Sequence, residues 1–147
     1  MILVDVNVLV YAHRADAVDH VLYRQWLEGV IQSGQPYGIS DHVLSGFLRV
    51  VTHPRIFTPP SPIQSALEFA WQVRDQPNCR VIAPGSRHWQ IFTDLCKSQS
   101  AVGNLIPDIW FASLAIESNC EWITTDSDYE KIPGLRWRHP ITGKAST

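Results

Sequence analysis

The chain begins with an apolar, β-branched run that ends on a carboxylate. Met1-Ile2-Leu3-Val4 leads into Asp5, and helical character begins almost at once in the residues that follow. Runs of this kind are typical of strands that are buried on both faces, as in a parallel sheet. An Asp at the end of such a strand is either the N-cap of a helix or a functional carboxylate. The choice depends on whether the rest of the chain brings further carboxylates to the same edge of the sheet.

Helical and extended segments alternate along the rest of the chain. Apolar residues at helical spacing predict helices over residues 18–33, 42–51, 62–75, 86–98 and 106–118. Short apolar or aromatic runs predict strands over residues 37–40, 79–83, 121–125 and 135–139. This alternation predicts an α/β fold, with a central, mostly parallel sheet flanked by helices. We expect residues 1–140 to form this single domain and residues 141–147 to form a flexible C-terminal tail.

The apolar faces of these helices predict much of the core. The helix over residues 18–33 places Val18, Val21, Leu22, Trp26 and Val30 at helical spacing. The helix over residues 62–75 places Ile63, Ala66, Leu67, Ala70 and Trp71 on one face. The six tryptophans are likewise expected to be core residues.

Composition limits the class of protein. A chain of 147 residues with 45% hydrophobic residues can bury the core of one globular domain. Its three cysteines are odd in number and form no C-x-x-C pair, which favours buried thiols in a reducing compartment. The chain shows neither a signal peptide nor an apolar run long enough to span a membrane. We therefore expect a cytoplasmic protein.

The net charge of −2 favours no particular partner. A module dedicated to binding duplex nucleic acid is usually strongly basic. A nucleic-acid substrate would therefore have to be bound through metal ions or a small arginine cluster. Motifs for a P-loop, a dinucleotide site, a serine-hydrolase elbow and an H-E-x-x-H zinc site are all absent.

Three further acidic residues are expected to join Asp5 at one edge of the sheet. In open parallel sheets, binding sites form at the carboxyl ends of the strands. Asp126 and Asp128 follow the strand predicted over residues 121–125, and Asp108 lies in the first turn of the helix over 106–118. Asp108 shares the inward-facing stripe of that helix. A helix dipole stabilises a carboxylate by only about 0.3–1 kcal/mol, so several clustered carboxylates call for a hard divalent cation.

Each of these residues also has a purely structural explanation. Asp5 is a possible strand-end cap, Asp126 and Asp128 suit turns, and Asp108 suits the positive end of a helix dipole. The convergence of all four at one edge favours the functional interpretation. Asn7 and Asn104 are candidates to support the site by hydrogen bonds, although Asn near a helix start is usually a cap.

Four motifs, in this order, resemble those of one known family. They are Val4-Asp5-Val6-Asn7-Val8-Leu9, the run from Phe47 to Phe57, Gly103-Asn104-Leu105-Ile106-Pro107-Asp108, and Thr124-Thr125-Asp126-Ser127-Asp128-Tyr129. The sequence resembles PIN-domain ribonucleases of the VapC toxin type, in the branch abundant in mycobacteria. The resemblance implies a PIN fold, Mg²⁺- or Mn²⁺-dependent endoribonuclease activity, a homodimer and inhibition by a small cognate antitoxin. It places Asp5 and Asp108 at the metal-ligand positions of the family.

The chain departs from the family pattern at Gly46. Many members carry a Glu immediately before the Phe-Leu-Arg run, where this chain has Gly46. Asp41 is no obvious substitute, because five residues correspond to about 500° of helix rotation. The site therefore has one carboxylate fewer, and a second metal ion is expected to bind weakly or only with RNA.

These features together predict the toxin of a type II toxin–antitoxin pair that cleaves tRNA or rRNA. Asp5 and Asp108 are expected to hold the main ion, with Asp126 and Asp128 contributing directly or through water. Arg49 and Arg55 are candidates to bind RNA phosphate, ahead of Arg87 and Lys97, although for any single one of the four a surface salt bridge is the better explanation.

Two alternatives remain open. One is a metal nuclease that acts on DNA. The other is a catalytically weakened PIN-domain protein that binds RNA or an antitoxin, for which Gly46 is the argument.

Overall fold

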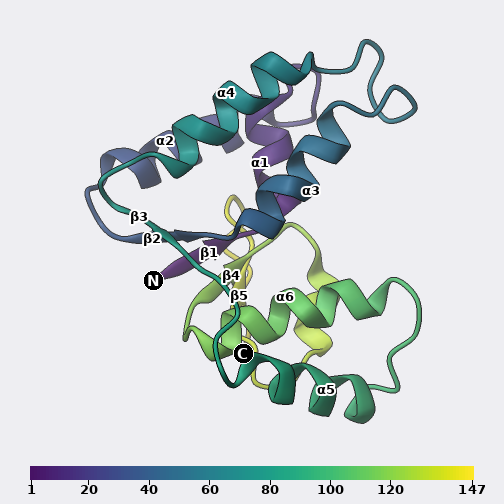
Figure 1. Ribbon diagram of the computed structural model, residues 1–147. Helices are drawn as coiled ribbons and strands as arrows, with labels where there is room; N and C mark the ends of the chain where they lie inside the picture. The colour runs from purple at the N-terminus through teal and green to yellow at the C-terminus, as the bar shows by residue number, and fades with distance from the viewer.

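The computed structural model describes all 147 residues, which form one five-stranded sheet between two layers of helices (Figure 1). The strands are β1 (Ile2–Val4), β2 (Tyr37–Ile39), β3 (Cys79–Val81), β4 (Glu121–Ile123) and β5 (Trp137–Arg138). The helices are α1 (Val6–His13), α2 (His20–Gln32), α3 (Asp41–Val51), α4 (Ile63–Arg74), α5 (His88–Ser98) and α6 (Leu105–Glu117). Helices α1 to α4 cover one face of the sheet, and α5 and α6 cover the other. The predicted α/β fold is confirmed.

Strand β1 lies at the centre of the sheet and is buried, as its apolar sequence predicts for a strand covered on both faces. The strand order is β3-β2-β1-β4-β5, and all four neighbouring pairs are parallel. Leu3 and Val4 in β1 are fully buried, and so are Trp122 and Ile123 in β4. The chain runs outward from β1 through β2 to β3 and then returns to the other side of β1 as β4. The switch in strand order therefore falls between β1 and β4, which is where open α/β sheets form their sites.

The first amphipathic helix is shorter than its sequence pattern predicts. Asp19 has a φ of 58°, so α2 cannot extend back beyond His20. Val18 and Val21 are then 82% and 61% exposed, outside the core. Strands β3, β4 and β5 are also shorter than predicted by two or three residues each.

Helix α4 buries the small residues of its apolar face and exposes the large ones. Ala66 and Ala70 are 0% and 7% exposed, whereas Ile63, Leu67 and Trp71 are 57%, 40% and 60% exposed. Helix α4 contacts α3, where Phe69 packs on Phe47 with ring centroids 5.0 Å apart. The expectation of a single buried face was therefore wrong for the three large residues.

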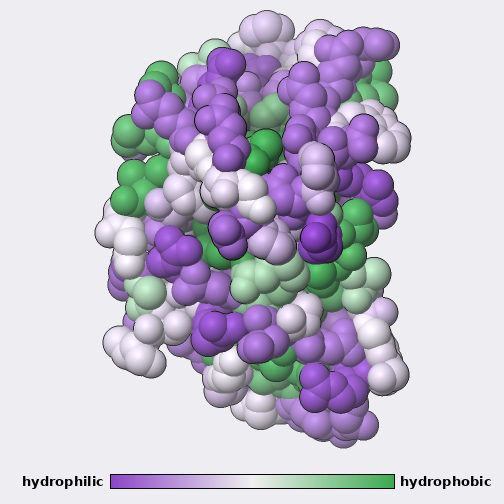
Figure 2. All heavy atoms as spheres, turned by 90° about the vertical axis from the view of Figure 1, so that its left-hand side faces the viewer, coloured by the Kyte–Doolittle hydropathy of each residue, from purple (hydrophilic) through white to green (hydrophobic).

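The surface of the molecule is mixed in polarity. On the face shown in Figure 2, hydrophilic side chains alternate with small apolar patches. Trp89, expected in the core, is 69% exposed. No helix is both long and apolar enough to cross a membrane.

Residues 141–147 fold back on β5, where the Ser146 amide donates to the Trp137 carbonyl at 3.0 Å. The flexibility expected of these residues stays a prediction.

Two glycines should respond oppositely to replacement by alanine. A Cβ on Gly38 in β2 would lie 3.0 Å from the Ile2 carbonyl oxygen, whereas a Cβ on Gly29 in α2 would meet nothing within 4 Å. Gly38→Ala should destabilise the protein by about 1–3 kcal/mol through overpacking. Gly29→Ala should stabilise it by about 0.5–1 kcal/mol, because alanine is the better helix former. Denaturant unfolding of both variants measures the two effects; equal effects would contradict the packing at β2.

Candidate active site

Asp5 both caps a helix and faces the candidate site. Its side chain is 6% exposed, and its Oδ1 accepts a hydrogen bond of 2.6 Å from the Val6 amide at the start of α1. Its other oxygen, Oδ2, accepts a bond of 2.7 Å from the Thr124 hydroxyl. The parallel register of β1 and β4 brings these two residues together, since it pairs Val4 with Ile123. Asp5 is therefore a helix N-cap, and its position at the candidate site keeps the interpretation of a functional carboxylate open.

Thr124 links three segments of the site and was not singled out from the sequence. It is fully buried, and its hydroxyl oxygen accepts bonds from the Asp126 amide at 3.0 Å and from Asn7 Nδ2 at 3.4 Å. Asn7 Oδ1 accepts in turn from the Thr125 amide at 3.3 Å. Asn7 thus lies in the network around Asp5. The signal for Thr124 was its place immediately after a buried strand, opposite the residue that follows β1.

Asp108 approaches the same network from the opposite layer of helices. It lies half-buried in the first turn of α6, and its stripe partners Ala112 and Ala115 are fully buried, as the sequence pattern predicts. Its Oδ1 accepts a bond of 3.3 Å from the hydroxyl of Tyr129. Tyr129 was also missed, although it lies three residues after Asp126 in the 3₁₀ turn Ser127–Lys131.

The acidic residues after β4 differ in their surroundings. Asp126 lines a cleft that Asp5 and Asp108 also line. It caps the 3₁₀ turn, where its Oδ1 accepts a hydrogen bond from the Asp128 amide at 2.9 Å. Asp128 is exposed, does not line the cleft, and has its Oδ1 3.6 Å from Lys131 Nζ. Asn104 is exposed ahead of α6, forms no cap hydrogen bond and does not line the cleft. The structure therefore brings three of the four acidic candidates into one cavity.

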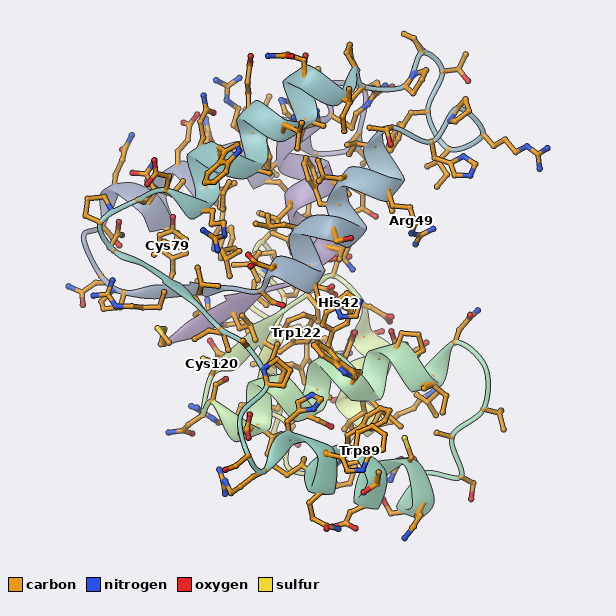
Figure 3. The ribbon with its side chains drawn as sticks, viewed as in Figure 1. His42, Arg49, Cys79, Trp89, Cys120 and Trp122 are labelled. Carbon is orange, nitrogen blue, oxygen red and sulfur yellow. The ribbon has the colours of Figure 1, made fainter.

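This cleft has a volume of about 630 Å³ and two unlike walls. Asp5, Asp108 and Asp126 contribute carboxylates from three separate segments. The facing wall is one flank of α3, and Figure 3 shows His42 at the end of this helix next to α6 and Arg49 further along the helix. The lining residues of α3 are His42, Ser45, Gly46, Arg49 and Val50.

The arginine and lysine candidates separate by position. Arg49 is exposed, lines the cleft and forms no ion pair with the chain's own carboxylates. Arg55 and Lys97 are exposed but do not line it. Arg87 does not line the cleft, and its guanidinium Nη2 donates to the Glu117 carbonyl at 3.4 Å. Of the four, only Arg49 is in a position to reach a ligand held by the three carboxylates.

Gly46 leaves the α3 wall without a carboxylate, and its neighbour Val6 explains how the space is filled. A Cβ on Gly46 would lie 3.0 Å from Val6 Cγ2, which is tighter than ordinary packing. A longer side chain at this position therefore requires Val6 to move.

Burial makes the negative charge of Asp5 costly. Desolvation raises the pKa of Asp5 to about 7, and the nearby carboxylates Asp108 and Asp126 add to this shift. The hydrogen bonds from Thr124 and from the Val6 amide act in the opposite direction. Desolvation also raises the pKa of Asp108, against the hydrogen bond from Tyr129. A bound cation would offset these costs.

The carboxylates suit a hydrated metal ion rather than a tightly enclosed one. No three His, Cys, Asp or Glu side chains are gathered closely enough to form a ready-made metal site. The donors that line the cleft are carboxylate oxygens, which Mg²⁺ and Mn²⁺ prefer. Mg²⁺ commonly takes one or two protein carboxylates and keeps several waters. The residues present therefore fit such an ion.

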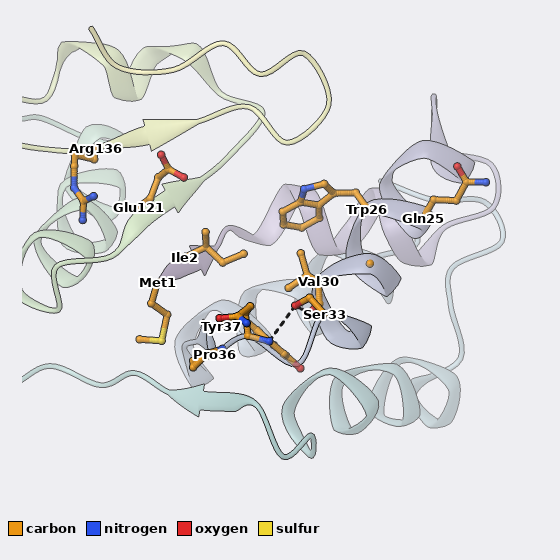
Figure 4. A pocket seen from close by; sticks show the side chains of 12 residues that line it. Met1, Ile2, Gln25, Trp26, Val30, Ser33, Pro36, Tyr37, Glu121 and Arg136 are labelled. Carbon is orange, nitrogen blue, oxygen red and sulfur yellow. Dashed lines mark hydrogen bonds between the residues drawn. The ribbon is translucent and has the colours of Figure 1, made fainter.

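A second and larger hollow lies at the opposite edge of the sheet (Figure 4). Its volume is about 820 Å³, and Trp26, Tyr37, Glu121 and Arg136 are among its lining residues. It lies at the amino ends of β1, β2 and β4 and has a single carboxylate, Glu121. The smaller cleft is the better candidate site, because three carboxylates line it and only one lines the larger hollow.

The metal-free protein should lose stability as the pH rises, through Asp5. The folded protein keeps a proton on Asp5 up to a pKa of about 7, whereas the unfolded chain loses it near 3.8. Between these values the folded state binds more protons, so its stability falls with rising pH, by up to about 1.4 kcal/mol per unit. Asp5→Asn keeps the cap and removes this dependence. Urea unfolding at about pH 5 and about pH 7 should show that the free energy of unfolding of Asp5→Asn, relative to that of wild type, is higher at pH 7 than at pH 5. The same difference in unfolding free energy at both pH values would contradict the buried charge.

Comparison with known proteins identifies the family. A model described as the PIN domain matches residues 2–135. The chain is similar to Ribonuclease VapC43 of Mycobacterium tuberculosis (strain ATCC 25618 / H37Rv), with 43% identity over 144 residues, covering 98% of each chain.

Solved structures share the fold at low sequence identity. VapBC2 from Rickettsia felis, bound to promoter DNA, gives a TM-score of 0.65 at 22% identity, covering 94% of this chain and 98% of that one. A toxin–antitoxin complex from Klebsiella pneumoniae gives 0.56 at 16% identity, covering 95% and 98%. VapC20 from Mycobacterium tuberculosis, a toxin that cleaves the sarcin–ricin loop, gives 0.60 at 14% identity, covering 88% and 92%. The resemblance seen in the sequence is thus confirmed, and the chain belongs to the VapC ribonuclease family of PIN-domain proteins.

Proposed function

We propose that this protein is the toxin of a type II toxin–antitoxin pair and a metal-dependent endoribonuclease. The observation that carries the proposal is the convergence of Asp5, Asp108 and Asp126 on one cleft from three distant segments. The relative at 43% identity is named a ribonuclease, and one similar structure is named a toxin that cleaves the sarcin–ricin loop. A tRNA or rRNA loop is the proposed substrate.

The carboxylates are proposed to bind the metal ion, and the α3 wall is proposed to bind the RNA phosphate. Asp5 and Asp108 would hold a Mg²⁺ or Mn²⁺ ion, Asp126 would contribute directly or through water, and Asp128 would contribute only through water from its exposed position. Such an ion would supply a Lewis acid for the scissile phosphodiester and a means to orient the attacking water. Arg49 binds a phosphate of the RNA across the cleft, and Arg55 is available only to a longer strand.

The remaining residues hold the carboxylates in place. Thr124 fixes the Asp5 carboxylate through its 2.7 Å hydrogen bond, and Asn7 steadies Thr124 and the backbone before Asp126. Asn104 contributes at most to the start of α6. We further propose a cognate small antitoxin as partner, a homodimer as the working state, and a cytoplasmic location; the Klebsiella pneumoniae toxin–antitoxin complex with the same fold supports the antitoxin.

The loss of RNA cleavage on substituting each carboxylate should depend on its position relative to the cleft. Asp5→Asn and Asp108→Asn should each lower RNA cleavage at least about 100-fold, because loss of a direct ligand exceeds the usual 10–100-fold cost of losing a supporting residue. Asp128→Asn should lower it much less. Asp41→Asn is a matched control, since Asp41 is an exposed carboxylate paired with Arg74. Cleavage is measured on RNA and on single-stranded DNA in parallel.

RNA cleavage by Asp5→Asn at the same rate as by the wild type would refute the proposed site. Preferential cleavage of DNA by the wild type would instead favour the alternative of a DNA-directed nuclease.

Gly46 favours the alternative of a weakened enzyme that binds RNA or an antitoxin without efficient turnover. RNA binding with no metal-dependent product at micromolar protein would support this alternative.

Restoring a carboxylate on α3 should strengthen metal binding. Gly46→Glu alone meets Val6, whereas Gly46→Glu with Val6→Ala provides the space. The double variant should need roughly tenfold less Mn²⁺ for half-maximal cleavage, because an added charge near the ion contributes more than about 1.4 kcal/mol at an effective dielectric constant near 20. Val6→Ala alone is the control. An unchanged Mn²⁺ requirement would show that this wall of the cleft lies too far from the ion.

A further inference from the structure

The hydroxyl of Tyr129 is a buried polar group whose one hydrogen-bond partner is a carboxylate of the cleft. Tyr129 is 4% exposed, and its hydroxyl donates to Asp108 Oδ1 at 3.3 Å. Asp108 in turn has no other side-chain hydrogen bond and no ion pair. The contact joins the turn after β4 to the first turn of α6, which are 21 positions apart in sequence.

Packing alone does not explain the hydroxyl. The ring of Tyr129 packs against Trp122, with centroids 5.7 Å apart and an interplanar angle of 57°. A phenylalanine would make the same contact. A hydroxyl at this depth costs free energy unless it is hydrogen-bonded, so its presence is explained by the carboxylate it reaches.

The phenol can act only as a donor to the carboxylate. An ordinary tyrosine phenol carries its proton at neutral pH, and this phenol donates it to Asp108 Oδ1 in the 3.3 Å hydrogen bond. Because the bond uses Asp108 Oδ1, the second oxygen of Asp108 is left for another ligand.

We propose that Tyr129 is a positioning residue, which orients the Asp108 carboxylate toward the divalent ion of the cleft. The inference rests on the proposed function, because that function supplies the ion. Asp126 has a part in the arrangement, since it caps the turn that carries Tyr129 and also lines the cleft. One turn thus provides both a candidate ligand and the support for a second.

The test is Mn²⁺ binding to the metal-free protein, without RNA, in wild type and in Tyr129→Phe. Electron paramagnetic resonance of free Mn²⁺ gives the dissociation constant directly. Loss of a supporting hydrogen bond to a ligand weakens metal binding 10–100-fold, and the length of this bond favours the lower end, about tenfold. At saturating Mn²⁺, the KM for RNA should change much less than the Mn²⁺ dissociation constant, because Tyr129 lines the cleft with only 4% of its surface exposed and its hydroxyl donates to Asp108.

Tyr37→Phe is the matched control. Tyr37 is also buried, at 1% exposure, and its hydroxyl donates to the Val73 carbonyl at 2.5 Å; it begins β2 and lines the hollow at the amino ends of the strands, not the carboxylate cleft. This variant loses a buried phenol hydrogen bond and should bind Mn²⁺ as wild type does. The Mn²⁺-induced rise in Tm is a second measurement, which depends only on protein that folds.

The outcomes separate the two proposals. Equal or tighter Mn²⁺ binding by Tyr129→Phe would overturn the positioning role and leave the proposed function intact. Equal weakening in Tyr129→Phe and Tyr37→Phe would overturn it as well, since it would reveal a general effect of lost stability. Absence of Mn²⁺ binding to the wild type, with or without a non-cleavable RNA, would overturn both.

Discussion

The hydrogen bond between Thr124 and Asp5 is the contact on which the site depends. It joins the ends of β1 and β4, the strands between which the strand order switches, and measures 2.7 Å. The parallel pairing of Val4 with Ile123 sets this contact, since the next residue on each strand is then Asp5 or Thr124. A shift of one residue in that register would turn Asp5 away from Thr124 and separate the cleft carboxylates.

The same contact places a carboxylate where its charge is costly. Asp5 is 6% exposed at the centre of the sheet, and burial raises its pKa to about 7. The fold tolerates this because two hydrogen bonds satisfy both oxygens of the carboxylate. A divalent cation is the natural counter-charge. The cleft therefore combines one fixed carboxylate, Asp5, with two candidate ligands that are only partly buried, Asp108 and Asp126.

The family pattern and this chain differ on the α3 wall. Gly46 places no carboxylate there, and Val6 occupies the adjoining space. The wall instead presents Arg49, which has no carboxylate partner within the chain. A negative wall therefore faces a wall with a free positive charge, an arrangement suited to a phosphodiester bound through an ion on one side and a guanidinium on the other.

The sequence by itself determined the α/β class, the buried central strand and the acidic residues, because apolar periodicity and strand-end carboxylates are local signals. It could not determine which flank of α4 is buried, since Ile63, Leu67 and Trp71 share their spacing with Ala66 and Ala70. Nor could it separate Asp126 from Asp128, or find Thr124 and Tyr129. Only the tertiary structure decided these points, because they depend on the register of β1 with β4 and on the packing of the turn after β4 against α6, and both are contacts between segments far apart in the chain.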